Sequence, residues 1–203
     1  MHPNPAFRSA PDAQNLAFAR SRGFGILSVN GADGPLAAHV PFLLSEDGSH
    51  ADLHLARSNP IARTQPGPAV LMVSGPDAYV SPDWYGATDQ VPTWNYIAVH
   101  LRGVLHPLPD EALHDHVDAL SAEHENRLLP KTPWLSSKMT EGVMPRMMRM
   151  ILPFRFVVTA TDGTWKLNQN KPAAVRDAAA AALAAQPGAG AQAISALMRD
   201  LPE

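Results

Sequence analysis

Twenty prolines are spread along this chain of 203 residues, and they limit how long most helices and strands can be. Between the prolines lie short apolar or alternating runs, which are typical of strands, and only a few stretches with helical periodicity. We count six or seven strands and about four helices, with no repeat of strand, long helix and strand. This pattern favours a mainly β (α+β) fold, an antiparallel barrel with peripheral helices, over a doubly wound parallel sheet.

The helices are predicted from their end signals. Asp12 can cap a helix over residues 13–22, which Gly23 ends. Asp110 can cap a second helix, and Leu113, Val117 and Leu120 would form its apolar side. The Ala-rich tail, residues 173–203, reads as two helices broken at Gln186-Pro-Gly.

The strands are predicted from alternation and β-branched content. The turn residues Asp47-Gly48 join two of them into a hairpin, and Asp162-Gly163 indicates a second tight hairpin between 148–161 and 164–170. The other predicted strands are 23–31, 68–82 and 91–108.

Bulk composition excludes several classes of protein. A net charge of −3 gives no basic excess for nucleic acid, and no apolar run reaches the ~18 residues of a membrane span. The absence of cysteine excludes disulfides and thiolate sites and fits a reducing compartment. We therefore expect a single domain over residues 1–203, soluble, cytoplasmic and without a membrane partner.

The first hairpin places two histidines on one face. Pairing around Asp47-Gly48 sets Pro41 opposite His54 and His39 opposite Ala56. The other face is apolar throughout and is predicted to face the core; it carries Val40, Phe42, Leu44, Leu53 and Leu55.

A basic and polar stretch follows directly after the second strand of this hairpin. Asn59 suits an N-cap and Pro60 the first helical position, so a helix start is predicted beside Arg57 and Ser58. A guanidinium, a hydroxyl and free backbone N–H groups form a phosphate site. The alternative is a capped helix with Arg57 in a surface ion pair.

Two further stretches carry polar groups next to aromatic ones. In VPTWNY, Trp94 and Tyr96 share one strand face, and Asn95 lies on the other. An amide beside aromatic rings can bind a planar heterocycle, although such aromatic residues more often fill a core or an interface. The KLNQN stretch, residues 166–170, offers a lysine and three amides as ligand donors or as loop polar groups.

Other chemistry finds little support. The GAGAQA stretch follows a helix rather than a strand, so it lacks the context of a dinucleotide fingerprint. The nine histidines show no strong metal-ligand spacing, and no metal is predicted. Neither a serine-hydrolase motif nor a helix-turn-helix is found.

Five motifs, in this order, carry a resemblance to a known family: AAHVPFLL, LHLARSNP, GPDAYVSPDWY, VPTWNYIAVHLRG and KLNQN. The chain resembles the PaiB-type FMN-binding negative transcriptional regulators, which share the split-barrel flavin fold of the pyridoxamine-phosphate oxidases. The resemblance covers nearly the whole chain. It implies a six-stranded antiparallel split β-barrel, a homodimer, and FMN bound near the subunit interface.

The resemblance also implies roles for individual residues. His39, Val40 and Pro41 would run along the isoalloxazine ring, His54 and Ala56 would line the same pocket, and Arg57, Ser58 and Asn59 would hold the phosphate. Trp94 and Asn95 would approach the ring or the ribityl chain. Lys166, Asn168 and Gln169 would close the pocket. The related oxidases carry an arginine at the position of His39, so phosphate neutralisation would rest more heavily on Arg57 here.

Three functions remain open at this point. The first is an FMN-binding protein of the regulator family, for which DNA binding follows from the resemblance alone. The second is a flavin-dependent oxidoreductase acting on a small molecule, in which His39, His54 or Lys166 assists proton transfer. The third is an interaction protein that has kept the barrel and lost the flavin.

Overall fold

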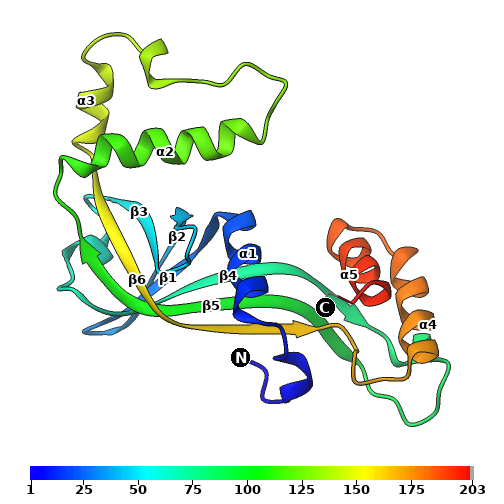
Figure 1. The fold of residues 1–203 in the computed structure, drawn as a ribbon. Helices are drawn as coiled ribbons and strands as arrows, with labels where there is room; N and C mark the ends of the chain where they lie inside the picture. The colour runs from blue at the N-terminus through cyan, green and yellow to red at the C-terminus, as the bar shows by residue number, and fades with distance from the viewer. Residues whose placement is uncertain (202–203) are drawn as a thin grey trace. The chain divides into compact units, whose positions relative to one another are not determined.

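A computed structural model of the chain describes residues 1–201, and its six strands form a closed ring in the order β1-β2-β3-β6-β5-β4 (Figure 1). The pairs β1–β2, β1–β4, β2–β3 and β3–β6 are antiparallel. The predicted antiparallel barrel is thus confirmed. The strand bounds are β1 Phe24–Gly31, β2 Gly34–Leu44, β3 His50–Ala56, β4 Gly67–Val80, β5 Thr93–Pro107 and β6 Ile151–Lys166.

Where β2 and β3 pair, the register is the predicted one: Phe42 pairs with Leu53, Leu43 with Asp52 and Leu44 with Ala51. The predicted pairs Pro41–His54 and His39–Ala56 lie beyond this paired segment, and Pro41 and His39 pair instead with Phe24 and Ile26 of β1. The apolar face is buried as expected, and Val40 and Phe42 are almost fully inaccessible to solvent. The alternation of the two strands therefore separates a core face from a face available for other contacts.

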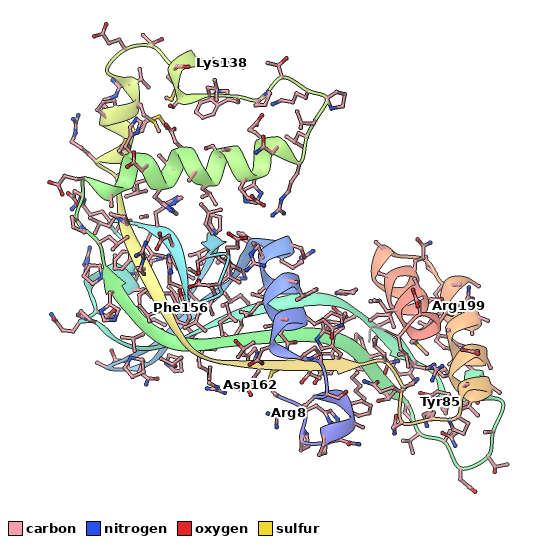
Figure 2. The ribbon with its side chains drawn as sticks, viewed as in Figure 1. Arg8, Tyr85, Lys138, Phe156, Asp162 and Arg199 are labelled. Atoms are coloured by element: carbon pink, nitrogen blue, oxygen red, sulfur yellow. The ribbon has the colours of Figure 1, made fainter. Side chains whose placement is uncertain are left out.

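The second predicted hairpin is wrong, because β6 runs without a turn through Asp162-Gly163. A Cβ at Gly163 would lie only 2.0 Å from Asn15 Oδ1, so glycine is needed there for a close approach of chain segments. Asp162 pairs with Arg8 at 3.1 Å, and Figure 2 labels both residues. The Asp-Gly signal thus reflects packing against the N-terminal region.

The helices mostly follow their predicted end signals. The first ends at Gly23, whose φ is +57°, and the Ala-rich tail forms two helices. The second helix begins later than expected, with Glu111 rather than Asp110 at its N-cap, and no side chain caps it. The bounds are α1 Asp12–Arg22, α2 Ala112–Asn126, α3 Val143–Met148, α4 Ala173–Ala184 and α5 Ala189–Arg199.

The helix predicted after Asn59 is a single 3₁₀ turn, η2 Pro60–Arg63. Asn59 does cap it, since its Oδ1 accepts a hydrogen bond of 2.9 Å from the N–H of Ile61. A turn of four residues has almost no aligned peptide dipoles, so the expected helix-terminal charge is not available. No helix within residues 1–201 has the length and apolarity to cross a membrane.

The chain divides by its internal contacts into two compact units. The C-terminal unit comprises residues 1–18, 73–100 and 161–203, and the hairpin unit comprises residues 19–72 and 101–160. The expectation of a single domain stays a prediction.

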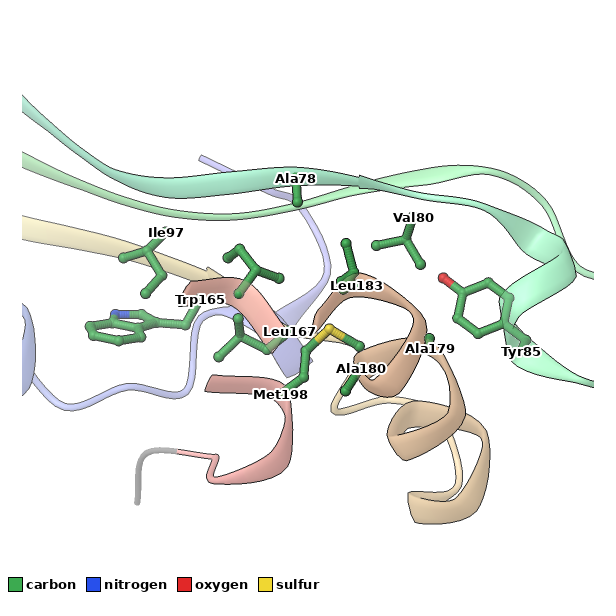
Figure 3. Close-up of a cluster of buried hydrophobic side chains, with 11 residues drawn as sticks. Ala78, Val80, Tyr85, Ile97, Trp165, Leu167, Ala179, Ala180, Leu183 and Met198 are labelled. Carbon is green, nitrogen blue, oxygen red and sulfur yellow. The ribbon is translucent and has the colours of Figure 1, made fainter. Parts of the chain in front are cut away.

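The C-terminal unit has its own apolar cluster (Figure 3). Leu183 of α4 and Met198 of α5 pack there with Trp165 and Leu167, which lie at and after the end of β6. The alanines of α4 let the two helices approach closely, and Ser195 Oγ donates a 2.6 Å hydrogen bond to Ala180 O between them. The Ala-rich tail is therefore part of a core.

Candidate functional site

The exposed face of the β2–β3 hairpin carries four of the predicted ring-side residues. His39 and Ala56 are exposed, and Pro41 and His54 are half-buried. Val40 points the other way and is 2% exposed, so only its backbone could contact a ligand. The hairpin therefore presents a shallow surface made of imidazole, proline and alanine.

An aromatic residue absent from the predicted site extends this surface. Phe24, which pairs with Pro41 across β1 and β2, is half-exposed, and its ring stacks on His39 at a centroid distance of 6.3 Å. Flat aromatic and imidazole rings side by side suit a planar ligand. The sequence contained a signal for this residue. Phe24 begins a strand whose inward-facing residues are all small or aliphatic, so the aromatic ring itself lies on the outer face.

The strand end holds the predicted phosphate residues together. Arg57 and Ser58 are exposed, and the Asn59 side chain is already used as the cap of η2. Arg57 Nε donates to Arg149 O at 3.1 Å, and its guanidinium lies 3.6 Å from the carboxylate of Asp110. The surface ion pair of the alternative interpretation is thus formed, while other guanidinium N–H groups stay available.

His54 is bonded to a second histidine that the site prediction did not include. Its Nδ1 lies 3.1 Å from Nε2 of His116, which is buried on α2. Burial lowers the pKa of both rings, that of His116 to about 4, with a further lowering by His54 and an opposing effect of the Asp52 carboxylate. Both imidazoles are therefore neutral near pH 7, and one donates to the other. His116 follows Leu113 and precedes Leu120 at helical spacing, so its inward direction was readable from the sequence.

The remaining predicted residues belong to the C-terminal unit, and Trp94 is the most accessible of them at 52%. Its Nε1 donates a 2.9 Å hydrogen bond to Asp77, and its ring packs edge-on against Tyr79. Tyr79 is also about half-exposed. The strands β4 and β5 thus present a fixed aromatic pair to solvent.

Asn95 faces inward, on the opposite strand face from Trp94 as the alternation predicts. It is fully buried, and its Nδ2 lies 3.3 Å from the sulfur of Met198 on α5. Its Oδ1 has no hydrogen-bond partner within residues 1–201. The side chain therefore lies among the apolar residues under α5.

The three residues of the KLNQN stretch also have internal partners. Lys166 donates to Thr93, and burial lowers the pKa of its ammonium group. Asn168, at a φ of +61°, donates to Tyr85 Oη at 3.1 Å. Gln169 spans the backbone of Trp165 and Leu167 with its amide. These amides stabilise the chain where β6 ends.

The hairpin unit has the donor set that FMN requires. A phosphate needs charged and neutral donors, and the exposed guanidinium of Arg57 with the hydroxyl of Ser58 supplies both. A flat ring needs an accessible surface of low polarity, which Phe24, His39 and Pro41 provide on β1 and β2. The residues present therefore fit FMN.

Sequence comparisons identify the family. Residues 1–160 match the family model described as "Putative FMN-binding domain". The "Protease synthase and sporulation protein PAI 2" of Bacillus subtilis is 27% identical over 172 residues, covering 82% of each chain. An uncharacterised protein of Aspergillus fumigatus is 25% identical, with 79% of this chain and 82% of that protein covered.

Solved structures share the fold at low sequence identity. The FAD and heme binding protein from Mycobacterium smegmatis has a TM-score of 0.57 at 14% identity, with 79% of this chain and 73% of that chain covered. The flavocytochrome Anf3 from Azotobacter vinelandii has a TM-score of 0.55 at 12% identity, with coverage of 82% and 72%. The split-barrel prediction is confirmed, and the chain belongs to the FMN-binding domain family that its PaiB-like motifs indicated.

Proposed function

We propose that this protein binds FMN with its phosphate at Arg57 and Ser58 and its ring along the exposed face of β2 and β3. The observations that carry this proposal are the exposed guanidinium and hydroxyl that follow β3, and the half-exposed Phe24 ring stacked on the exposed His39 of β2. FMN, when bound, supplies the redox chemistry of its ring. The residues of the chain bind the phosphate, orient the ring and shield one of its faces from water.

The test is the visible absorbance spectrum of the purified protein, recorded before and after addition of FMN and desalting. We expect flavin bands to remain with the protein after desalting. A protein that loses all added FMN under these conditions would contradict the proposal.

We also propose that the protein is a homodimer with FMN near its interface. Support comes from the half-exposed aromatic residues Phe24, Tyr79 and Trp94, since aromatic residues are enriched in the centres of interfaces. Light scattering during size-exclusion chromatography measures the mass directly. A mass of twice 21.8 kDa is expected, and a monomer at micromolar concentration would contradict the dimer.

A regulatory role in the cytoplasm is the biological function that we propose for this FMN-binding dimer. It is supported by the PaiB-like motifs and by the similarity to PAI 2, whose name links that protein to protease synthesis and sporulation. The expected result is retention of specific DNA that weakens with salt, measured with and without FMN. If DNA is not retained, and the bound flavin instead turns over with a nicotinamide donor and an acceptor, the oxidoreductase alternative replaces it.

A further inference from the structure

Within the hairpin unit, a long segment between β5 and β6 packs on β3. This covering segment, residues 108–150, contains α2, the loop after it and α3, and Figure 1 shows it as one excursion between the two strands. Its helix α2 buries only Leu113, His116 and Leu120. Burial of Leu113 and Leu120 is the main apolar contribution to this contact, and polar contacts fix the segment at its ends.

Polar contacts attach the covering segment at three places. His116 bonds to His54 on β3, and Arg127 donates to the carbonyls of Ser21 and Arg20 at the end of α1. At the base of the segment, Arg57 reaches both Arg149 O and the Asp110 carboxylate. The bonds of Arg127 and Arg57 are exposed and exchange readily with water or with another ligand, whereas the His54–His116 bond is partly buried.

Two of the side chains that hold the covering segment are also the ones that the proposed FMN site uses. His54 lies on the ring-side face, and Arg57 is the cationic donor for the phosphate. The Asp110 carboxylate lies where it neutralises Arg57, and a phosphate of about −1.5 to −2 at the same guanidinium would repel it. FMN and the covering segment therefore compete for the same groups.

We infer that Asp110 is a built-in competitor of the FMN phosphate, so that FMN binding at Arg57 displaces it and loosens the start of α2 from His54. This inference rests on the proposed function. Because coupling is reciprocal, anything that weakens the hold of the segment raises the affinity for FMN. Loosening α2 also uncovers Leu113 and Leu120, so flavin occupancy changes an apolar surface of the protein.

The test compares Asp110→Asn with the wild type in titrations with FMN and with riboflavin, which lacks the phosphate. Asp110 is largely exposed, so this substitution leaves the fold intact. We expect FMN affinity to rise about two- to fivefold, the range of an exposed ion pair, and riboflavin affinity to rise less. Asp115→Asn is the matched control, since this carboxylate on α2 is almost fully exposed and pairs weakly with His114 alone.

Hydrogen exchange of the wild-type protein supplies a second readout. Amides of residues 112–120 should exchange faster with FMN than without it, and riboflavin should have a smaller effect. If the wild type binds FMN, but Asp110→Asn leaves its affinity unchanged and FMN slows exchange in α2, the inference is overturned and the proposed function stands. A wild type that binds no FMN overturns both.

Discussion

The two groups of predicted ligand residues differ in how the fold uses them. In the hairpin unit, Arg57 and Ser58 are exposed, and the partners of Arg57 are an exposed carboxylate and a backbone carbonyl. In the C-terminal unit, Asn95 and Asn168 are almost fully buried and have internal partners. The motifs therefore combine exposed residues, which a ligand can reach, with buried residues that stabilise the fold.

The largest expected loss of stability follows from shortening a side chain in the apolar cluster of the C-terminal unit. Leu183→Ala removes a side chain that is 1% exposed, so the free energy of unfolding should fall by about 2–5 kcal/mol. Urea denaturation measures this loss. The control is Leu128→Ala, which removes a half-exposed leucine and should change stability by less than about 0.5 kcal/mol. Equal small losses in both variants would show that α4 is not part of a core.

The histidine pair of the hairpin unit should give a pH-dependent stability. The pKa of His116 falls from 6.5 to about 4 on folding, so the unfolded chain binds the proton more readily. Stability is therefore fully present above about pH 6.5 and declines as the pH falls towards 4, by about 1–2 kcal/mol once partial solvation is allowed for. Asp52, paired with Arg155, is the carboxylate that faces the pair.

Thermal unfolding between pH 7.5 and pH 4.5 measures this effect. In the variant His116→Gln the side chain at this position does not titrate, so its melting temperature should depend less on pH than that of the wild type. Parallel pH profiles for both proteins would contradict a lowered pKa of His116 in the folded protein.

Asn95→Leu should have the smallest effect on stability, and it should stabilise the protein rather than destabilise it. The substitution keeps the volume of the side chain and removes a buried amide oxygen without a partner, so stability should stay equal or rise by about 1 kcal/mol. FMN affinity should not change, because the side chain points into the apolar cluster. If affinity falls while the exposed control Asn170→Leu keeps it, Asn95 contacts the flavin, as the family resemblance implied.

Local patterns were sufficient to predict the hairpin and its face. Alternation over residues 39–56 gave the register, because a slip by one residue would bury both histidines and expose Phe42. Helix ends at Gly23 and at the Gln186-Pro-Gly break were also predicted, since backbone preference decides them locally.

Long-range contacts account for what the sequence did not reveal. Gly163 allows the close contact with Asn15, which lies far away in the chain. This contact overrides the local preference of Asp-Gly for a turn. Likewise, the contact of His116 with His54 depends on where the covering segment folds back. The cap at Asn59 predicted where η2 begins but not that it is a single turn.

The phosphate assignment is tested most directly by titrating the wild type and Arg57→Ala with FMN and with riboflavin, followed by flavin fluorescence. A charge-assisted bond of about 1.5–3 kcal/mol predicts that Arg57→Ala weakens FMN binding about ten- to a hundredfold. Riboflavin affinity should be nearly the same in both proteins, because riboflavin has no phosphate. Equal FMN affinity in the two proteins would contradict the assignment of the phosphate to Arg57.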